Sequence, residues 1–170
     1  MSDLKVSSVY GLLVRHDTWA TDRLIAFCEG LTPAQRTLSV PGTYGTIEAT
    51  LQHLVAAKER YHQTLASERP GAGAVDESAV PSLLDLSQLR RRSLLLGDAF
   101  LGLADMDPER VLERRRRDGT ILHAKAGTIL AQLIHHGNDH RTQVETTLSA
   151  HGITAGRPDL DVWAFVAAEG

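Results

Sequence analysis

Apolar positions in the first part of the chain repeat with the spacing of a helix. From Val9 to Phe27, large or apolar residues recur every three or four positions, as on one helical face. Gly30 and the pair Thr32-Pro33 interrupt the repeat. The pattern therefore predicts a first helix that begins at Val9 and ends before Gly30.

A second helix is predicted after a loop that contains Pro41, Gly42 and Gly45. Thr46 offers a side-chain oxygen to the unpaired amides at the start of this helix. The following segment, residues 67–82, has turn composition and no periodicity, which indicates a connector. The buried face of the second helix should include Ile47, Thr50, Leu54, Tyr61 and Leu65.

Two more helices and a short hairpin complete the pattern. A leucine-rich stripe predicts a third helix from about Ser82 to Ala104, and a fourth stripe predicts a last helix from about Thr128 to Gly152. Between them, Asp118-Gly119 suits the tight turn of a hairpin within residues 111–125. We expect the aromatic residues of the closing segment, 158–165, to pack back on the helices. The predicted fold class is all-α.

Composition narrows the functional classes. The 170 residues suit one domain, with 42% hydrophobic and 23% charged residues, and the net charge of −3 gives no general attraction to nucleic acid. No stretch approaches the 18 or so apolar residues of a membrane span. Cys28 is the single cysteine, and the charged N-terminal region does not resemble a signal peptide. We therefore expect a single-domain, cytoplasmic protein without nucleic-acid or membrane partners.

Three histidines are candidates for a metal site. His136 and His140 are four residues apart on the apolar stripe of the last helix, so their side chains project from one face. Chance alone gives roughly 0.4 such pairs in a chain of this histidine content. His53 lies next to Leu54 on the second helix and could point toward that pair. The alternative is that all three are core histidines, hydrogen-bonded to carbonyl or carboxylate groups.

Sequence motifs around these histidines resemble those of the DinB-like superfamily. Residues 44–61, which include His53, resemble its second-helix signature, and residues 136–143 resemble its last-helix motif, His-x-x-x-His-Arg-x-Gln. Thr142 departs from that motif, in which glycine is commoner. Residues 16–24 and 159–163 resemble its first-helix and closing segments. The resemblance covers nearly the whole chain in the same order.

The resemblance implies a fold, a site and an activity. The fold would be a four-helix bundle with up-down-down-up topology, forming a homodimer, and His53, His136 and His140 would bind one divalent metal ion. Relatives include thiol-dependent S-transferases and isomerases that use mycothiol or bacillithiol. We therefore favour transfer of a low-molecular-weight thiol to a small electrophilic substrate. The alternatives are a metal-dependent hydrolase and a protein that binds metal or a small molecule without turnover.

The chemistry of such a site follows from its donor set. Three imidazoles leave an open coordination position, where the ion would lower the pKa of a bound water or thiol. An all-imidazole set suits zinc or nickel better than ferrous iron. No catalytic residue is assigned. Asp17 and Glu59 are weak candidates for a general base, whereas Gln143 and Asn138 could orient the ligands, and His16 could line the site.

Two arginine clusters suggest an alternative function, nucleic-acid binding. Residues 90–92 and 114–117 are all arginine and could contact the phosphates of a nucleic acid. The net acidity, the few aromatic residues and the absence of a nucleic-acid-binding motif oppose this. A solvated charged surface explains the clusters more simply.

Overall fold

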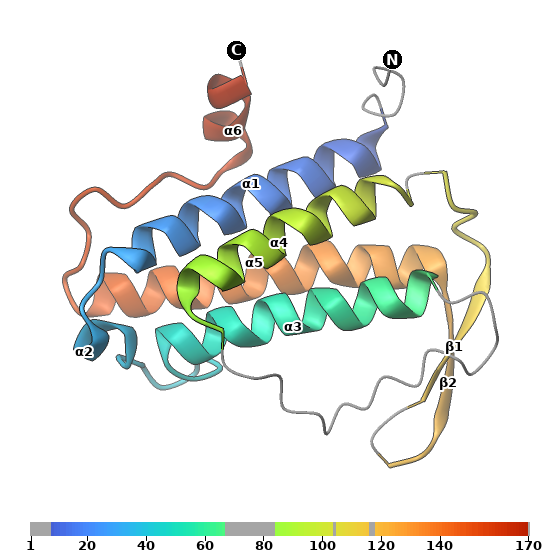
Figure 1. The fold of residues 1–170 in the computed structure, drawn as a ribbon, viewed down its shortest axis with the longest axis horizontal. Helices are drawn as coiled ribbons and strands as arrows, with labels where there is room; N and C mark the ends of the chain where they lie inside the picture. The colour runs from blue at the N-terminus through green and yellow to red at the C-terminus, as the bar shows by residue number, and fades with distance from the viewer. Residues whose placement is uncertain (1–7, 67–83, 104, 116–117, 170) are drawn as a thin grey trace.

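Four long helices lie side by side in the computed structural model, which describes residues 8–66, 84–103, 105–115 and 118–169 (Figure 1). They are α1 (Val9–Glu29), α3 (Ile47–Ala66), α4 (Leu86–Leu101) and α5 (Ala126–Ala150). Helix α1 packs against α4 and α5, and α3 packs against α5 and α4. The chain is thus mostly helical, and its apolar core lies between these helices.

The predicted helices agree with the observed ones to within a few residues. Helices α1 and α3 begin at Val9 and Ile47 as expected, and α5 begins two residues earlier than predicted, at Ala126. Helix α4 begins at Leu86, where the Asp85 carboxylate accepts a hydrogen bond from the Gln88 amide, and it ends at Leu101 with Gly102 as its C-cap. The predicted end at Ala104 was therefore three residues too late. The predicted connector, residues 67–82, lies outside the described residues.

The predicted hairpin is present and leads directly into α5. Strands β1 (Val111–Arg115) and β2 (Ile121–Lys125) pair antiparallel, with Val111 opposite Lys125. Gly119, in the turn, has a φ of 82°, a conformation that suits glycine. The first amides of α5 are bound by the segment before β1: the Ala126 amide donates to the Arg110 carbonyl at 2.8 Å and the Gly127 amide to the Pro108 carbonyl at 2.9 Å.

Two short helices were not predicted. Helix α2 (Pro33–Arg36) begins with a capping box formed by Thr32 and Gln35, and α6 (Val162–Glu169) lies against α1. The expected packing of the closing aromatics is correct for Phe165, which is 2% exposed and contacts the rings of His16 and Trp19. It is wrong for Trp163, which is 80% exposed, because it lies on the outer face of α6.

Candidate metal centre

The structure brings His53, His136 and His140 together between α3 and α5. The four-residue spacing places His136 and His140 on one face of α5, and α3 packs against that face with His53. The Nε2 atom of His136 lies 3.1 Å from Nε2 of His53 and 3.2 Å from Nε2 of His140. One ligand atom from each histidine falls within 4.8 Å of the other two. The three residues chosen from the sequence thus form one cluster.

The donor atoms of this cluster suit a metal ion better than they suit one another. Three nitrogen ligands at about 2.0–2.1 Å from a tetrahedral zinc ion are roughly 3.3 Å apart, close to the two shortest separations found here. A proton on His136 Nε2 can be directed well at only one of its two neighbouring nitrogens, whereas an ion accepts a lone pair from all three. The residues present therefore fit a divalent ion.

A glutamine sets the orientation of one candidate ligand. The Oε1 atom of Gln143 lies 3.0 Å from His140 Nδ1, so that nitrogen carries the proton and donates it to the amide oxygen. In neutral His140 the Nε2 lone pair is then free to bind an ion. The same Gln143 oxygen accepts a hydrogen bond of 3.0 Å from the Tyr44 amide. The expected orienting role of Gln143 agrees with these contacts.

Burial keeps two of the imidazoles neutral. It lowers the pKa of His53 to about 4, with smaller contributions from His140 and Arg60. It also lowers the pKa of His136 to about 4, and there the neighbouring histidines, Arg60 and Lys58 act in the same direction. Neutral imidazole is the form that binds metals, so both groups are ready to act as ligands at pH 7.

Two tyrosines border the cluster. The Tyr44 ring, 54% exposed, stacks on the His53 ring with centroids 4.0 Å apart, and meets the His140 ring edge-on at 5.4 Å. The buried Tyr61 ring meets the His136 ring edge-on at 5.7 Å. Tyr44 therefore lies between His53 and solvent. Sequence analysis did not single it out, although it stands in the segment that resembles the second-helix signature.

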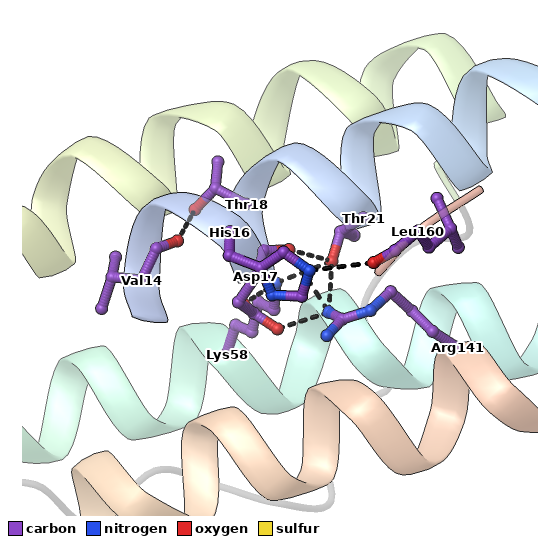
Figure 2. A network of polar contacts seen from close by, with 8 residues as sticks. All are labelled: Val14, His16, Asp17, Thr18, Thr21, Lys58, Arg141 and Leu160. Carbon is purple, nitrogen blue, oxygen red and sulfur yellow. Dashed lines mark hydrogen bonds and ion pairs between the residues drawn. The ribbon is translucent and has the colours of Figure 1, made fainter. Parts of the chain in front are cut away.

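A buried ionic cluster ties the helices of the site to α1 (Figure 2). The Asp17 carboxylate of α1 forms ion pairs with Lys58 of α3, at 2.6 Å, and with Arg141 of α5. The Thr21 hydroxyl accepts hydrogen bonds from the Lys58 ammonium at 3.1 Å and from Arg141 Nη1 at 3.0 Å. Although burial opposes ionisation, Lys58 and Arg141 hold the pKa of Asp17 below its usual value.

Glycine at position 137 makes room for this cluster. A Cβ atom there would lie 2.2 Å from Asp17 Oδ1 and 3.1 Å from Arg141 Nη1. Any larger residue would push α1 away from α5 or break the ion pair. Gly137 follows the candidate ligand His136 directly, so the close approach of the two helices is set beside the site itself.

Several sequence predictions around the site need correction. Asp17 is wrong as a general base, because Lys58 and Arg141 occupy its two carboxylate oxygens. Glu59 forms an ion pair with Arg92 rather than facing the histidines. His16 does not line the site, since its Nε2 lies 2.8 Å from the Leu160 carbonyl and its ring contacts Phe165.

Cys28 is a core residue, and two arginines of the first arginine cluster form surface ion pairs. Cys28 is buried, and burial raises the pKa of its thiol to about 12, which agrees with a packing role. Arg90 pairs with Asp22 at 2.6 Å, and Arg92 pairs with Glu59. The second cluster, residues 114–117, lies in or next to β1, and its side chains are outside the described part of the structure.

Comparison with family models decides the classification. The model of the DinB family matches residues 1–167, almost the whole chain. The chain belongs to the DinB family. This DinB membership confirms the resemblance drawn from the histidine motifs. The comparison with curated proteins gives no match, and no helix in the described part of this DinB protein is both long and apolar enough to cross a membrane.

Proposed function

We propose that this DinB protein binds one divalent metal ion through Nε2 of His53, His136 and His140, and that it uses the ion to transfer a low-molecular-weight thiol to a small electrophile. The observation that carries the proposal is the convergence of three imidazole nitrogens, two of the separations being 3.1 and 3.2 Å. The three-nitrogen set favours zinc or nickel over ferrous iron and leaves a position open for a substrate.

The chemistry of the proposed reaction is a substitution at the electrophile. A new carbon–sulfur bond forms, the leaving group departs with its bonding electrons, and the thiol proton is released. A divalent ion at this site would lower the pKa of a thiol and favour its thiolate form. The protein holds His140 in one tautomer through Gln143, and it covers His53 with the Tyr44 ring.

Metal content tests the first half of this proposal. Native, untagged protein should contain about one zinc or nickel ion per chain by elemental analysis, and a His53→Ala/His140→Ala variant should contain none after the same reconstitution. His135→Ala is the matched control, because His135 is an exposed neighbour of His136 on α5, and it should retain the metal. Equal metal content in native protein and double variant would refute the site.

A thiol screen tests the second half. The zinc-loaded and nickel-loaded proteins would be incubated with an activated aryl chloride and, in turn, mycothiol, bacillithiol or glutathione, while thioether and chloride are measured. Product that requires both thiol and His136 supports the transferase. Ester or amide hydrolysis without thiol would favour a hydrolase instead. Tight ligand binding without product would favour a binding protein.

We also propose the four-helix, up-down-down-up arrangement and a homodimer. Helices α1 and α5 run in one direction in Figure 1 and α3 and α4 in the other, which supports the arrangement. A cavity of about 450 Å³ between the start of α1 and α5 supports a homodimer, because its lining is mostly apolar and includes the exposed Val9 and Leu13. Light scattering coupled to gel filtration would give the mass directly, and a monomer at micromolar concentration would refute the dimer.

A further inference from the structure

The buried ionic cluster beside the histidine site carries an excess positive charge. One carboxylate, Asp17, is paired with two cations, Lys58 and Arg141, and all three side chains are no more than 4% exposed. Figure 2 shows Asp17 between the two cations, with the Thr21 hydroxyl completing their hydrogen bonds. Since Thr21 brings no charge, the cluster has a net charge of +1 with Lys58 protonated; burial lowers the pKa of Lys58, and its ion pair with Asp17 opposes that effect.

Neighbouring carboxylates do not balance this charge. Glu59 follows Lys58 in sequence, yet it is paired with Arg92. Glu145 lies one turn after Arg141; burial raises the pKa of its carboxyl, and Arg157 opposes that effect more than Arg141 does. The Arg157 guanidinium also donates to the Glu145 carbonyl at 3.3 Å. Glu59 is thus paired with another arginine, and among the described residues no ion pair joins the Glu145 carboxylate to Arg141.

The excess charge acts on the histidine site. Arg141 follows His140 directly on α5, and Lys58 lies on α3 five residues after His53. The Arg141 Nη1 atom also lies 3.1 Å from where a Cβ atom of Gly137, the residue after His136, would stand. These cations oppose positive charge at the histidines and favour negative charge there. Buried charges are screened little by salt, so the effect persists at physiological ionic strength.

We propose that the Asp17–Lys58–Arg141 cluster makes the histidine site select an anion, such as a thiolate or a carboxylate, as the ligand in the open coordination position. The inference rests on the proposed metal site and names the charge class of its ligand. The same field weakens binding of the metal ion itself. Removing one buried cation therefore has opposite effects on the metal and on the anion, whereas loss of structure weakens both.

The experiment uses the cobalt(II) form of the full chain, whose visible absorption bands report ligand exchange at the ion. Azide serves as the anionic probe and imidazole as the neutral probe, and both are titrated into wild type, Lys58→Met and Thr21→Val. Methionine keeps the length of the lysine side chain without its charge. Valine is the matched control, because it removes the hydrogen bonds of Thr21 to both cations without changing the charge of the cluster.

The expected result distinguishes an effect of charge on ligand binding from an effect of structural damage. In Lys58→Met the Kd for azide should rise roughly tenfold, because a buried positive charge near the site is removed. Its Kd for imidazole should stay within about twofold, and its cobalt affinity should be equal or higher. Thr21→Val should match wild type in all three. If Lys58→Met fails to fold, Arg141→Met removes the other cation of the cluster and should weaken azide by a similar factor.

Failure of the metal site and failure of the inference give different results. If wild-type protein shows no cobalt bands that depend on His53 and His136, the metal site is refuted and the inference falls with it. If cobalt binds but azide affinity is the same in wild type and Lys58→Met, the inference alone is overturned. Equal weakening of azide and imidazole binding in Lys58→Met would also overturn the inference, because a structural defect affects neutral and charged ligands alike. So would a loss of azide affinity in Thr21→Val as large as that in Lys58→Met, because Thr21→Val leaves the charge of the cluster unchanged.

Discussion

The histidine site and the ionic cluster differ in how far their polar atoms are satisfied. Both include residues of α3 and α5, and these residues are close together along the two helices; the ionic cluster adds Asp17 and Thr21 of α1. In the ionic cluster, each Asp17 oxygen has a cationic partner and Thr21 binds both cations. In the histidine site, three Nε2 atoms face one another, and His136 Nδ1 is buried without a hydrogen-bond partner among the described residues.

This difference separates a structural element from a functional one. A buried polar group costs free energy unless it is paired, so the ionic cluster pairs its groups and links α1 to the two helices of the site. The histidine cluster keeps polar atoms that the protein itself satisfies poorly, which is expected where a ligand is to be bound. Substitutions that break the ion pairs of the first should therefore have their largest effect on stability, and substitutions in the second should have their largest effect on binding.

The largest expected effect is on stability, from Asp17→Ala. This change leaves Lys58 and Arg141 buried without their carboxylate, and breaking such a pair costs about 3–5 kcal/mol of unfolding free energy. Urea unfolding followed by circular dichroism measures it. His53→Ala, in metal-free protein, is the comparison and should cost far less, because loss of its partly exposed ring removes packing and leaves no buried charge unpaired. Equal losses for the two variants would contradict the division between structure and binding.

Gly137→Ala should have the next largest effect. The added methyl group would lie 2.2 Å from Asp17 Oδ1, so α1 and α5 must separate locally, at a cost of about 1–3 kcal/mol despite the better helix propensity of alanine. Thermal and urea unfolding should both show the loss. Gly45→Ala is the control, since its Cβ would meet Ala49 at an ordinary 3.7 Å and should leave stability nearly unchanged.

Gln143→Leu should weaken metal binding without unfolding the protein. Leucine removes the acceptor that fixes His140 Nδ1, and loss of such an orienting partner typically costs about 10–100-fold in metal affinity. Competition with a chromogenic chelator gives the affinity. Gln143→Glu keeps an acceptor oxygen and should retain most of it. Unchanged affinity in the leucine variant would show that the His140 orientation is held by other contacts.

The two regions should also differ in how their stability depends on pH. The effect at the histidines should be the smallest of the expected effects, because both rings are partly exposed to solvent. The pKa of His53 and His136 is lowered to about 4, so the unfolded chain binds more protons between pH 6.5 and 4. Stability of the metal-free protein should therefore fall as pH drops through that window. The lowered pKa of Asp17 adds a further loss only below its unfolded value, near pH 3.8.

Urea midpoints measured across that range check this prediction. A His53→Ala/His136→Ala variant should lose most of the pH dependence between 6.5 and 4 and keep the loss at lower pH. The opposite pattern, with the upper window intact in the variant, would assign that dependence to other groups.

Local patterns in the sequence predicted much of the fold and the histidine cluster. The helical repeat located α1, α3 and α5, Asp118-Gly119 located the hairpin turn, and the spacing of His136 and His140 placed both on one face. His53 required only the expectation that two apolar stripes pack together. These features depend on residues close in sequence, or on the general rule that apolar helix faces pack together. They can therefore be predicted from the sequence alone.

The ionic cluster depends on partners from three helices, and sequence analysis therefore missed it. Asp17 was considered a weak candidate for a general base because its partners, Lys58 and Arg141, stand 41 and 124 positions away. A signal was nevertheless present. Each of the three charges occupies a buried position of its own helix: Asp17 follows Val14 by three, Lys58 follows Leu54 by four, and Arg141 precedes Val144 by three. When charged residues of opposite sign occupy core positions on separate helices, their positions predict that they pair with one another.

The anchored start of α5 has a consequence for how this protein can be altered. The Ala126 and Gly127 amides bind carbonyls from the segment before β1, so the position of the helix that carries two of the histidines is fixed at the base of the hairpin and not at its tip. The tip around Gly119 is exposed and remote from that anchor. A peptide tag or fluorophore inserted there should leave the histidines in register, which makes the hairpin a natural handle for immobilising or labelling the working protein.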